Sequence, residues 1–205
     1  MDESLKIVKT GTSEVIIKKS RFLGTAVEVT SEEQAREVVA AIRKEHYSAR
    51  HVCYAYSIGE KNPALKFSDD GEPGGTAGKP ILDVVQNSGI TDILVVVVRY
   101  FGGVLLGTGG LVRAYGEAAA KAVEDADKKV ICLSRIYDVT VDYADFDKVK
   151  YLIENEDGTD MEVSYTDKVV IRLTVPDRSA ELLEKQISEK TAGRCEIRYI
   201  ETKMV

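Results

Sequence analysis

Three carboxylates lie within one four-residue stretch of this 205-residue chain, at Asp69, Asp70 and Glu72. A flexible, glycine-rich segment follows them and enters a helix. The carboxylates could therefore bind a divalent cation or orient a basic partner, while free N–H groups at the helix start could hold an anion. The alternative is a structural turn whose carboxylates cap local N–H groups and pair with Arg99. The spacing is not that of an EF-hand calcium loop. The binding residues predicted here are Asp69, Asp70, Glu72, Thr76 and Lys79.

A second segment begins with Arg99 at the end of an apolar strand and passes through two aromatic residues to a glycine-rich turn before a helix. The helix start at 107–110 offers backbone donors and the positive end of the helix dipole to an anion, although it matches neither a dinucleotide fingerprint nor a P-loop. Alternatively, the glycines only allow close packing. In both cases we expect Arg99 to be buried against Asp69, Asp70 or Glu72, because an unpaired buried arginine is very costly. The binding residues predicted here are Arg99, Tyr100, Phe101, Gly102, Gly103, Thr108, Gly109, Gly110 and Arg113.

Nucleophilic catalysis has little support in the sequence. His51 and Cys53 share one face of a strand, where two residues separate Cβ atoms by about 6.5–7 Å, too far for direct proton transfer. Ser68 and Thr108 have no evident base, and the chain's two histidines are too few for a histidine-based metal site. We predict no metal and no cofactor, keep His51 as a binding residue and assign no catalytic residue.

Hydrophobic spacing predicts the elements that position these residues. Runs at 14–18 and 22–29 indicate an antiparallel pair, and Ser31 with Gln34 forms a capping box before a helix that ends near 45. Residues 51–58 alternate as a strand, 59–78 read as a long loop, and Pro80 starts a helix to about 87. The run 92–98 has no polar face, which is typical of a strand buried on both sides, and 111–126 is an alanine-rich helix.

A second pattern begins after residue 127. Strands at 136–141, 161–165, 169–175 and 195–199 and helices at 145–155 and from 177 follow the order β-α-β-β-α-β, the split βαβ or ferredoxin-like pattern. The second helix is expected to bury Leu182, Leu183 and Ile187. The sequence therefore predicts an α+β protein with two domains, residues 1–133 and 134–205.

Composition narrows the class of protein. Apolar residues make up 44% and charged residues 30%, which excludes wholesale disorder and fibrous classes. The longest apolar run, six residues, is far below the roughly 20 that span a bilayer. An acidic start and three scattered cysteines indicate a cytoplasmic protein. Most of the net charge of −6 lies after residue 133, where 16 acidic residues face 11 basic ones, so this part is a poor surface for nucleic-acid phosphates.

The two glycine-rich segments resemble the signature of the YigZ/IMPACT family. The match covers SDDGEPGGTAGKP at 68–80 and VVRYFGGVLLGTGGLVRAY at 97–115, with support from KSRF at 19–22 and ARHVCYAY at 49–56. The second pattern is similar to the second domain of the bacterial, two-domain members. The resemblance implies a first domain, an α/β sandwich, with the fold shared by domain IV of elongation factor G and the GHMP kinases. The second domain would be like domain V of elongation factor G.

The resemblance also implies a part in translation, because the eukaryotic relatives act in translational control by binding a large scaffold that activates an initiation-factor kinase. We expect a non-enzymatic protein that contacts ribosome, RNA or a translation-associated protein through the loop face of the first domain. There Tyr100 and Phe101, if exposed, could stack on bases or anchor a protein; the alternative is that both belong to the core. The alternative is an enzyme acting on a phosphorylated or anionic small molecule. It would use 107–110 as a phosphate cradle and Asp69, Asp70 or Glu72 for a metal or as a general base.

Overall fold

The computed structural model describes residues 3–205, which form two compact units. The N-terminal unit comprises Ser4–Val130, and the C-terminal unit comprises Ile131–Val205 together with Glu3. The described residues form five helices and two sheets, a mixed α/β architecture. No helix in this part of the chain is long and apolar enough to cross a membrane. The sequence-predicted domains, 1–133 and 134–205, stay a proposal about which segments fold independently.

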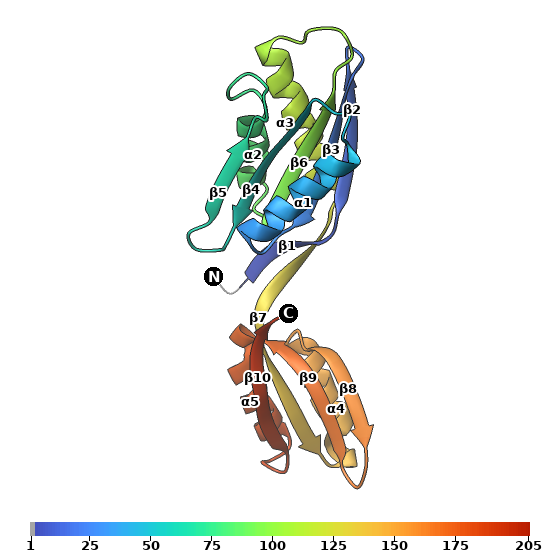
Figure 1. Ribbon diagram of the computed structural model, residues 1–205. Helices are drawn as coiled ribbons and strands as arrows, with labels where there is room; N and C mark the ends of the chain where they lie inside the picture. The colour runs from blue at the N-terminus through green and yellow to red at the C-terminus, as the bar shows by residue number, and fades with distance from the viewer. Residues whose placement is uncertain (1–2) are drawn as a thin grey trace. The chain divides into compact units, whose positions relative to one another are not determined.

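An antiparallel sheet forms the centre of the N-terminal unit, with strand order β2-β3-β6-β4-β5. Its strands are β2 (Gly11–Ile17), β3 (Ser20–Glu28), β6 (Ile93–Tyr100), β4 (His51–Ile58) and β5 (Ala64–Ser68). The run of β-branched and leucine residues in β6 is buried on both faces, as predicted, because helices cover both sides of the sheet (Figure 1). β1 (Glu3–Lys9) precedes this sheet.

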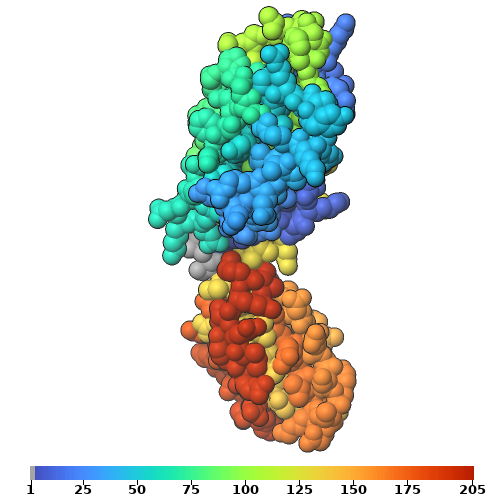
Figure 2. Space-filling model, in the orientation of Figure 1, coloured from blue at the N-terminus to red at the C-terminus, as the bar shows by residue number. Residues whose placement is uncertain are grey.

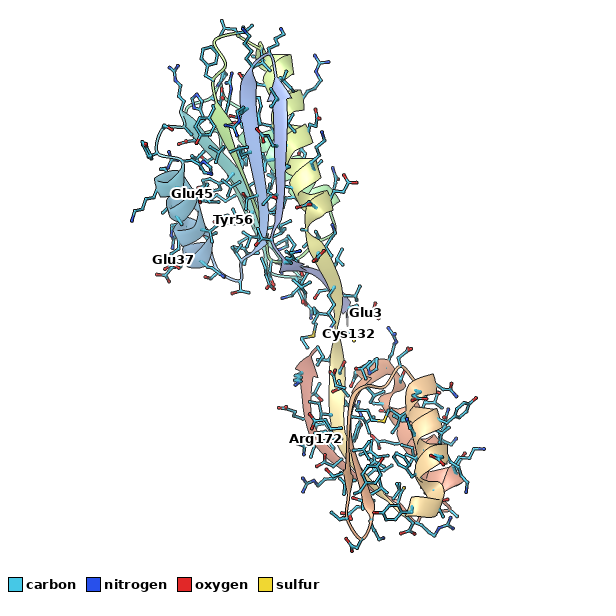
Figure 3. All side chains as sticks on the ribbon, turned by 90° about the vertical axis from the view of Figure 1, so that its right-hand side faces the viewer. Glu3, Glu37, Glu45, Tyr56, Cys132 and Arg172 are labelled. Carbon is cyan, nitrogen blue, oxygen red and sulfur yellow. The ribbon has the colours of Figure 1, made fainter. Side chains whose placement is uncertain are left out.

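One helix covers one face of the sheet and two helices cover the other. α1 (Glu32–Glu45) packs through Ala35 against Val52, Tyr56 and Val96, and its outer side chains form part of the face seen in Figure 2. Tyr56 points to the side of the sheet where α1 lies, as Figure 3 shows, and its hydroxyl donates to a carboxylate of that helix. α2 (Gly78–Asn87) and α3 (Thr108–Asp125) cover the opposite face and form the larger core with β3, β4 and β6.

The start of α1 confirms the predicted capping interaction. The Ser31 side chain accepts a hydrogen bond from the Gln34 backbone N–H, and the Gln34 side chain accepts one from the Thr30 N–H at 2.8 Å. The reciprocal bond thus reaches one residue further back than a standard capping box would place it. His46 is the residue that caps the other end of the helix.

The C-terminal unit shows the predicted β-α-β-β-α-β order. Its elements are β7 (Asp127–Val141), α4 (Tyr143–Asn155), β8 (Thr159–Tyr165), β9 (Val169–Pro176), α5 (Asp177–Lys190) and β10 (Glu196–Met204). The four strands lie antiparallel in the order β8-β9-β7-β10, so β7 and β9 occupy the centre, as in the split βαβ arrangement. Alternate residues of both central strands, including Val139 and Ile171, pack with Val149, Leu183 and Ile187 of the helices.

Four expectations about the elements are wrong. The predicted loop 59–78 contains β5, which lies at the sheet edge with exposed side chains and therefore lacks the apolar alternation that marks a strand. β7 begins at Asp127 instead of 136. Its first residues are charged and exposed, so they carry no apolar alternation that would mark a strand. α2 and α3 begin two and three residues earlier than predicted, at glycine-containing turns without an apolar pattern. Leu182 is 50% exposed, whereas its neighbour Leu183 is buried.

Candidate functional site

Asp69 organises the segment before α2. Its Oδ1 accepts hydrogen bonds from the backbone N–H groups of Ala77 and Gly78 at 2.9 and 2.8 Å, and its Oδ2 accepts one from Gly75 at 2.9 Å. Burial opposes ionisation of this carboxyl, but the three N–H donors outweigh burial and hold its pKa below the ordinary value. Asp69 therefore closes the turn and satisfies amides at the start of α2.

Asp70 connects the same segment to β4 of the sheet and to α1 through hydrogen bonds and an ion pair. Its Oδ2 accepts from the Val52 backbone N–H at 2.6 Å, and its Oδ1 pairs with Nη2 of Arg43 at 2.8 Å. Asp70 has φ 42° and Gly71 has φ 84°, so the chain turns sharply here. The Asp70 carbonyl lies 2.8 Å from Nδ1 of His51. Because a carbonyl only accepts, His51 carries a proton on Nδ1.

Glu72 lies at the centre of a buried polar cluster. Its Oε1 accepts from Nη1 of Arg99 at 2.6 Å and from the Tyr115 hydroxyl at 2.7 Å, and Nε2 of His51 lies 3.8 Å away. Arg99 is on β6, opposite His51 of β4 and Phe22 of β3, while Tyr115 is on α3. The predicted burial of Arg99 against a carboxylate is confirmed, and the partner is Glu72.

The guanidinium of Arg99 is enclosed by aromatic rings. Its central carbon lies 5.5 Å from the ring centroids of both Phe22 and Phe101, within the range of cation–π attraction. Arg99 is only 5% exposed, and its Nε has no hydrogen-bond partner among the described residues. The ion pair with Glu72 therefore leaves part of the hydrogen-bonding capacity of this arginine unused.

A pocket of about 330 Å³ opens over this cluster. Its lining combines polar and charged groups with apolar side chains. Its residues are Arg50, His51, Glu72, Pro73, Arg99, Phe101, Leu105, Leu106, Gly107, Thr108 and Leu111. We call this the Arg99 pocket. A concave, mainly apolar space with a few convergent polar groups is the usual form of a ligand site.

The start of α3 forms one edge of the Arg99 pocket. Gly107 has φ 74°, a conformation that favours glycine, and its carbonyl accepts the first helical hydrogen bond from Leu111 at 3.0 Å. Within the described residues, no side chain caps this helix start and its first turn holds no acidic residue. The N–H groups of the first turn are therefore available as donors at the positive end of the helix dipole.

The structure brings some of the predicted binding residues together and separates others. Those that line the Arg99 pocket are His51, Glu72, Arg99, Phe101 and Thr108. Asp69 and Asp70 support the adjoining segment, and the Thr76 hydroxyl donates to the Pro73 carbonyl within it. Lys79 pairs with Asp83 on the surface of α2, and Arg113 donates to the Gly109 carbonyl on α3. Gly103, Gly109 and Gly110 belong to the turn and first helical residues without lining the pocket.

Gly102 has a packing role. A Cβ added at Gly102 would lie 2.0 Å from the backbone of Lys19, so only glycine allows the β2–β3 turn to approach this closely. The Gly102 N–H also donates to the Ser20 hydroxyl at 3.1 Å. This glycine thus fixes the path of the chain between Arg99 and the helix start.

Tyr100 does not share a surface with Phe101. It is half-buried on the α1 side of the sheet, where its hydroxyl lies 2.8 Å from Nδ1 of His46. Phe101 is 45% exposed and lines the Arg99 pocket. The expectation of two adjacent exposed aromatics is therefore wrong: alternation along β6 puts Tyr100 on the face away from Arg99, while Phe101, just after the strand, lies against the Arg99 guanidinium.

The geometry gives little support to catalysis by Cys53 or to a metal at the carboxylates. Burial raises the pKa of the Cys53 thiol to about 12, and its Sγ donates to the Asp69 carbonyl at 3.0 Å, so a thiolate is not available near neutral pH. Asp69, Asp70 and Glu72 each point to different protein partners. In residues 3–205, no group of three or more His, Cys, Asp or Glu side chains is arranged to hold a metal ion.

Sequence reasoning missed several residues of the site. Tyr115 was read only as part of an alanine-rich helix, although a tyrosine that shares a helix face with Leu111 and Ala118 signals a buried hydroxyl in need of a partner. Leu105 and Leu106 line the pocket because of the path of their loop, for which the sequence has no periodic signal. Arg43, the partner of Asp70, comes from a helix distant in sequence.

Comparison with known proteins covers both units. Residues 18–123 match the family model described as the Impact N-terminal domain, and residues 139–194 match a domain of unknown function, DUF1949. The chain is 37% identical over 187 residues to an IMPACT family member from Haemophilus influenzae, which covers 90% of this chain and 91% of that protein. A solved structure described as that of an hypothetical protein is 34% identical, covers 98% of both chains and has a TM-score of 0.64.

A eukaryotic relative matches only part of the chain. Protein IMPACT-B from Xenopus tropicalis is 37% identical over 111 residues, which are 52% of this chain and 34% of that protein.

Proposed function

This chain belongs to the IMPACT family, and we propose that it is a non-enzymatic binding protein of the translation apparatus that holds its partner at the Arg99 pocket. The observation that carries the proposal is the pocket itself. It joins an exposed apolar rim, Phe101 and Leu105, to a buried ion pair, and its lining offers no activated nucleophile. Large apolar side chains exposed around a desolvated polar centre are typical of a protein contact.

We propose a protein or ribosomal surface as the partner ahead of bare RNA. The C-terminal part of the chain carries an excess of five acidic residues, which disfavours binding to phosphates. The family supports a part in translation, since the resemblance of the sequence to the eukaryotic members implies translational control. Such a protein works in the cytoplasm, where we place it.

We also propose that the N-terminal unit has the fold shared by domain IV of elongation factor G and the GHMP kinases, and that the C-terminal unit is like domain V. The strand order β8-β9-β7-β10 of the C-terminal unit supports the second part of this proposal. Likeness of fold does not by itself establish a shared function, so the partner must be tested at the pocket.

The enzyme alternative is less well supported. A general base or metal ligand needs a carboxylate oxygen open to the substrate or ion, yet three N–H groups hold Asp69, Arg43 and Val52 hold Asp70, and Arg99 and Tyr115 share Oε1 of Glu72. The one feature that still supports the enzyme alternative is the start of α3, whose N–H groups can bind an anion. This feature concerns binding and requires no chemical step.

Co-sedimentation with ribosomes at low and moderate salt tests the proposed function. The test variant is Phe101→Ala with Leu105→Ala, which trims the rim of the pocket. The matched control is Phe67→Ala with Leu65→Ala on β5, because Phe67 is 44% exposed, nearly equal to the 45% of Phe101. We expect the wild type and the control to pellet with ribosomes and the rim variant to remain in the supernatant.

Two results would contradict the proposal. One is pelleting of the rim variant as the wild type does, and the other is wild-type protein that stays in the supernatant at every salt concentration. Binding that survives in the rim variant and vanishes at moderate salt would instead indicate an RNA contact elsewhere on the surface.

A further inference from the structure

The unused hydrogen-bonding capacity of Arg99 calls for an acceptor. Glu72 engages Nη1, while Nε is buried without a partner among the described residues. Buried polar groups in proteins are almost always hydrogen-bonded, and an unsatisfied donor on a charged group is costly. Arg99 also lines the pocket, so an oxygen-bearing ligand bound there would add an acceptor for its guanidinium.

The start of α3 supplies a second, independent set of donors to the same space. α3 is 18 residues long, and Gly107 and Thr108 at its start line the pocket. Its first-turn N–H groups have no side-chain cap within the described residues, and the helix dipole places partial positive charge there. A negatively charged group is therefore favoured in this position.

The charge balance of the lining favours one negative charge over two. Glu72 balances Arg99, and it is the one carboxylate among the described residues that line the pocket. Arg50 then leaves a net charge of one, and the helix start adds partial charge only. A carboxylate matches this balance, whereas a phosphate near neutral pH carries up to two negative charges.

The apolar walls define the rest of the ligand. Phe101, Leu105, Leu106 and Leu111 supply apolar side chains to the lining. An apolar group attached to the carboxylate would bury its surface against these side chains, which is the main source of affinity in such pockets.

From these features we propose that the Arg99 pocket binds a carboxylate group attached to an apolar body, with the carboxylate between Arg99 and the start of α3. The ligand is either a free carboxylic acid or the carboxyl-terminal residue of a partner protein, since both present the same chemistry. The proposal rests on the proposed function only in placing both ligand and partner at one pocket.

Titration of the full-length protein by NMR or calorimetry tests this proposal. The probes are 4-methylpentanoate and its neutral isostere 4-methylpentanamide, with inorganic phosphate as a third probe. We expect the acid to bind about tenfold or more tightly than the amide, because one charge-assisted hydrogen bond accounts for such a factor. Equal affinity of acid and amide, tighter binding of phosphate, or no binding of the acid up to about 10 mM would overturn the proposal.

Two arms distinguish the sources of the carboxylate. A short peptide ending in Ala-Ala-Leu with a free carboxyl group is compared with the same peptide as its C-terminal amide. Binding of the free-acid peptide assigns the site to a protein C-terminus. Binding of 4-methylpentanoate without binding of either peptide assigns it to a small molecule.

A charge introduced at the helix start provides the matched variants. Thr108→Asp adds a carboxylate to the exposed first residue of α3, where it should support folding and compete with the ligand. Thr10→Asp makes the same change at an exposed position outside the lining. We expect the first variant to bind the acid about tenfold more weakly and the second to bind as the wild type does. Unchanged binding by Thr108→Asp would overturn the proposal.

The outcomes separate this proposal from the proposed function. Carboxylate binding without co-sedimentation would leave the ligand assignment standing and remove the ribosomal partner. Co-sedimentation that depends on the Phe101 and Leu105 rim, together with no binding of any carboxylate probe, would support the ribosomal partner and remove the carboxylate ligand.

Discussion

The two units use the same pair of side-chain types, arginine and carboxylate, in opposite environments. In the N-terminal unit, Arg99 and Glu72 are both buried beneath a pocket. In the C-terminal unit, Asp138 of β7 lies between Arg172 of β9 and Arg198 of β10, each directly opposite it in the register. Arg172, labelled in Figure 3, is exposed and binds both carboxylate oxygens, at 2.8 and 2.9 Å.

The difference shows how environment sets the role of an ion pair. Both arginines of the Asp138 cluster are exposed to solvent and donate three hydrogen bonds to the carboxylate, so the cluster helps to set the register of three strands at little cost. The Arg99 pair is expensive to bury and leaves Nε without a partner, so it is poorly explained by stability alone. Its position at the pocket offers an explanation, because a ligand there would meet the positively charged guanidinium.

The largest expected effect is the loss of Arg99. Arg99→Ala leaves Glu72 buried without its cation and should lower the free energy of unfolding by about 3–5 kcal/mol. Arg172→Ala should change stability little, because water replaces the lost contact. Urea unfolding of both variants measures the contrast. Equal losses in the two variants would remove the distinction between the clusters.

Asp69→Ala should have the next largest effect. It removes the acceptor of three backbone N–H groups and should cost about 2 kcal/mol, allowing for the part exposure of this side chain. Asp69→Asn keeps one acceptor oxygen and should lose less. Thermal unfolding followed by circular dichroism provides the comparison. Full stability of the alanine variant would show that the turn before α2 closes without Asp69.

The two tyrosine–glutamate bonds offer a finer comparison. Tyr115→Phe removes a hydroxyl from buried Glu72 and should cost about 1–2 kcal/mol. Tyr137→Phe removes a similar bond to Glu184, which is half-exposed and can be hydrated, so its cost should be smaller. Urea midpoints of the two variants give the difference. A larger loss of stability for Tyr137→Phe would contradict the claim that burial makes the bond to Glu72 the more important of the two.

The smallest expected effect is a pH dependence in the C-terminal unit. Hydrogen bonds from Arg172 and then Arg198 outweigh burial and hold the pKa of Asp138 below its ordinary value. A lowered pKa contributes stability that is present above the unfolded pKa of about 3.9 and is lost as pH falls through the folded pKa. The difference in melting temperature between wild type and Asp138→Asn should therefore shrink below about pH 4. A difference that grows on acidification would contradict this assignment.

Much of the fold could be predicted from residue spacing, because burial imposes a period on the sequence. The alternation of 51–58 predicted β4, and the apolar run at 92–98 predicted the doubly covered β6. β5 could not be found in this way, since an edge strand with exposed side chains carries no such period. The same alternation directs the side chains of Arg99 and Tyr100 to opposite faces of the sheet. It could therefore have predicted that Tyr100 and Phe101 do not share a surface.

The site was predicted only to the level of its segments. Charge and burial indicated that Arg99 needs a carboxylate partner, but the sequence could not decide among the three candidates, Asp69, Asp70 and Glu72. Glu72 is the partner because backbone N–H groups occupy Asp69 and a left-handed turn at Asp70 directs that residue to Val52 and Arg43. Such choices depend on loop conformation, which residue types alone do not encode.

Ribosome binding by variants with a new charge at the Arg99 pocket is the most direct test, because it examines the pocket and the partner in one measurement. Thr108→Asp and Thr10→Asp are compared with the wild type for co-sedimentation with ribosomes at low salt. We expect Thr10→Asp to pellet as the wild type does and Thr108→Asp, with its carboxylate at the start of α3, to stay in the supernatant. Equal pelleting of all three proteins would show that the Arg99 pocket is not where the partner binds.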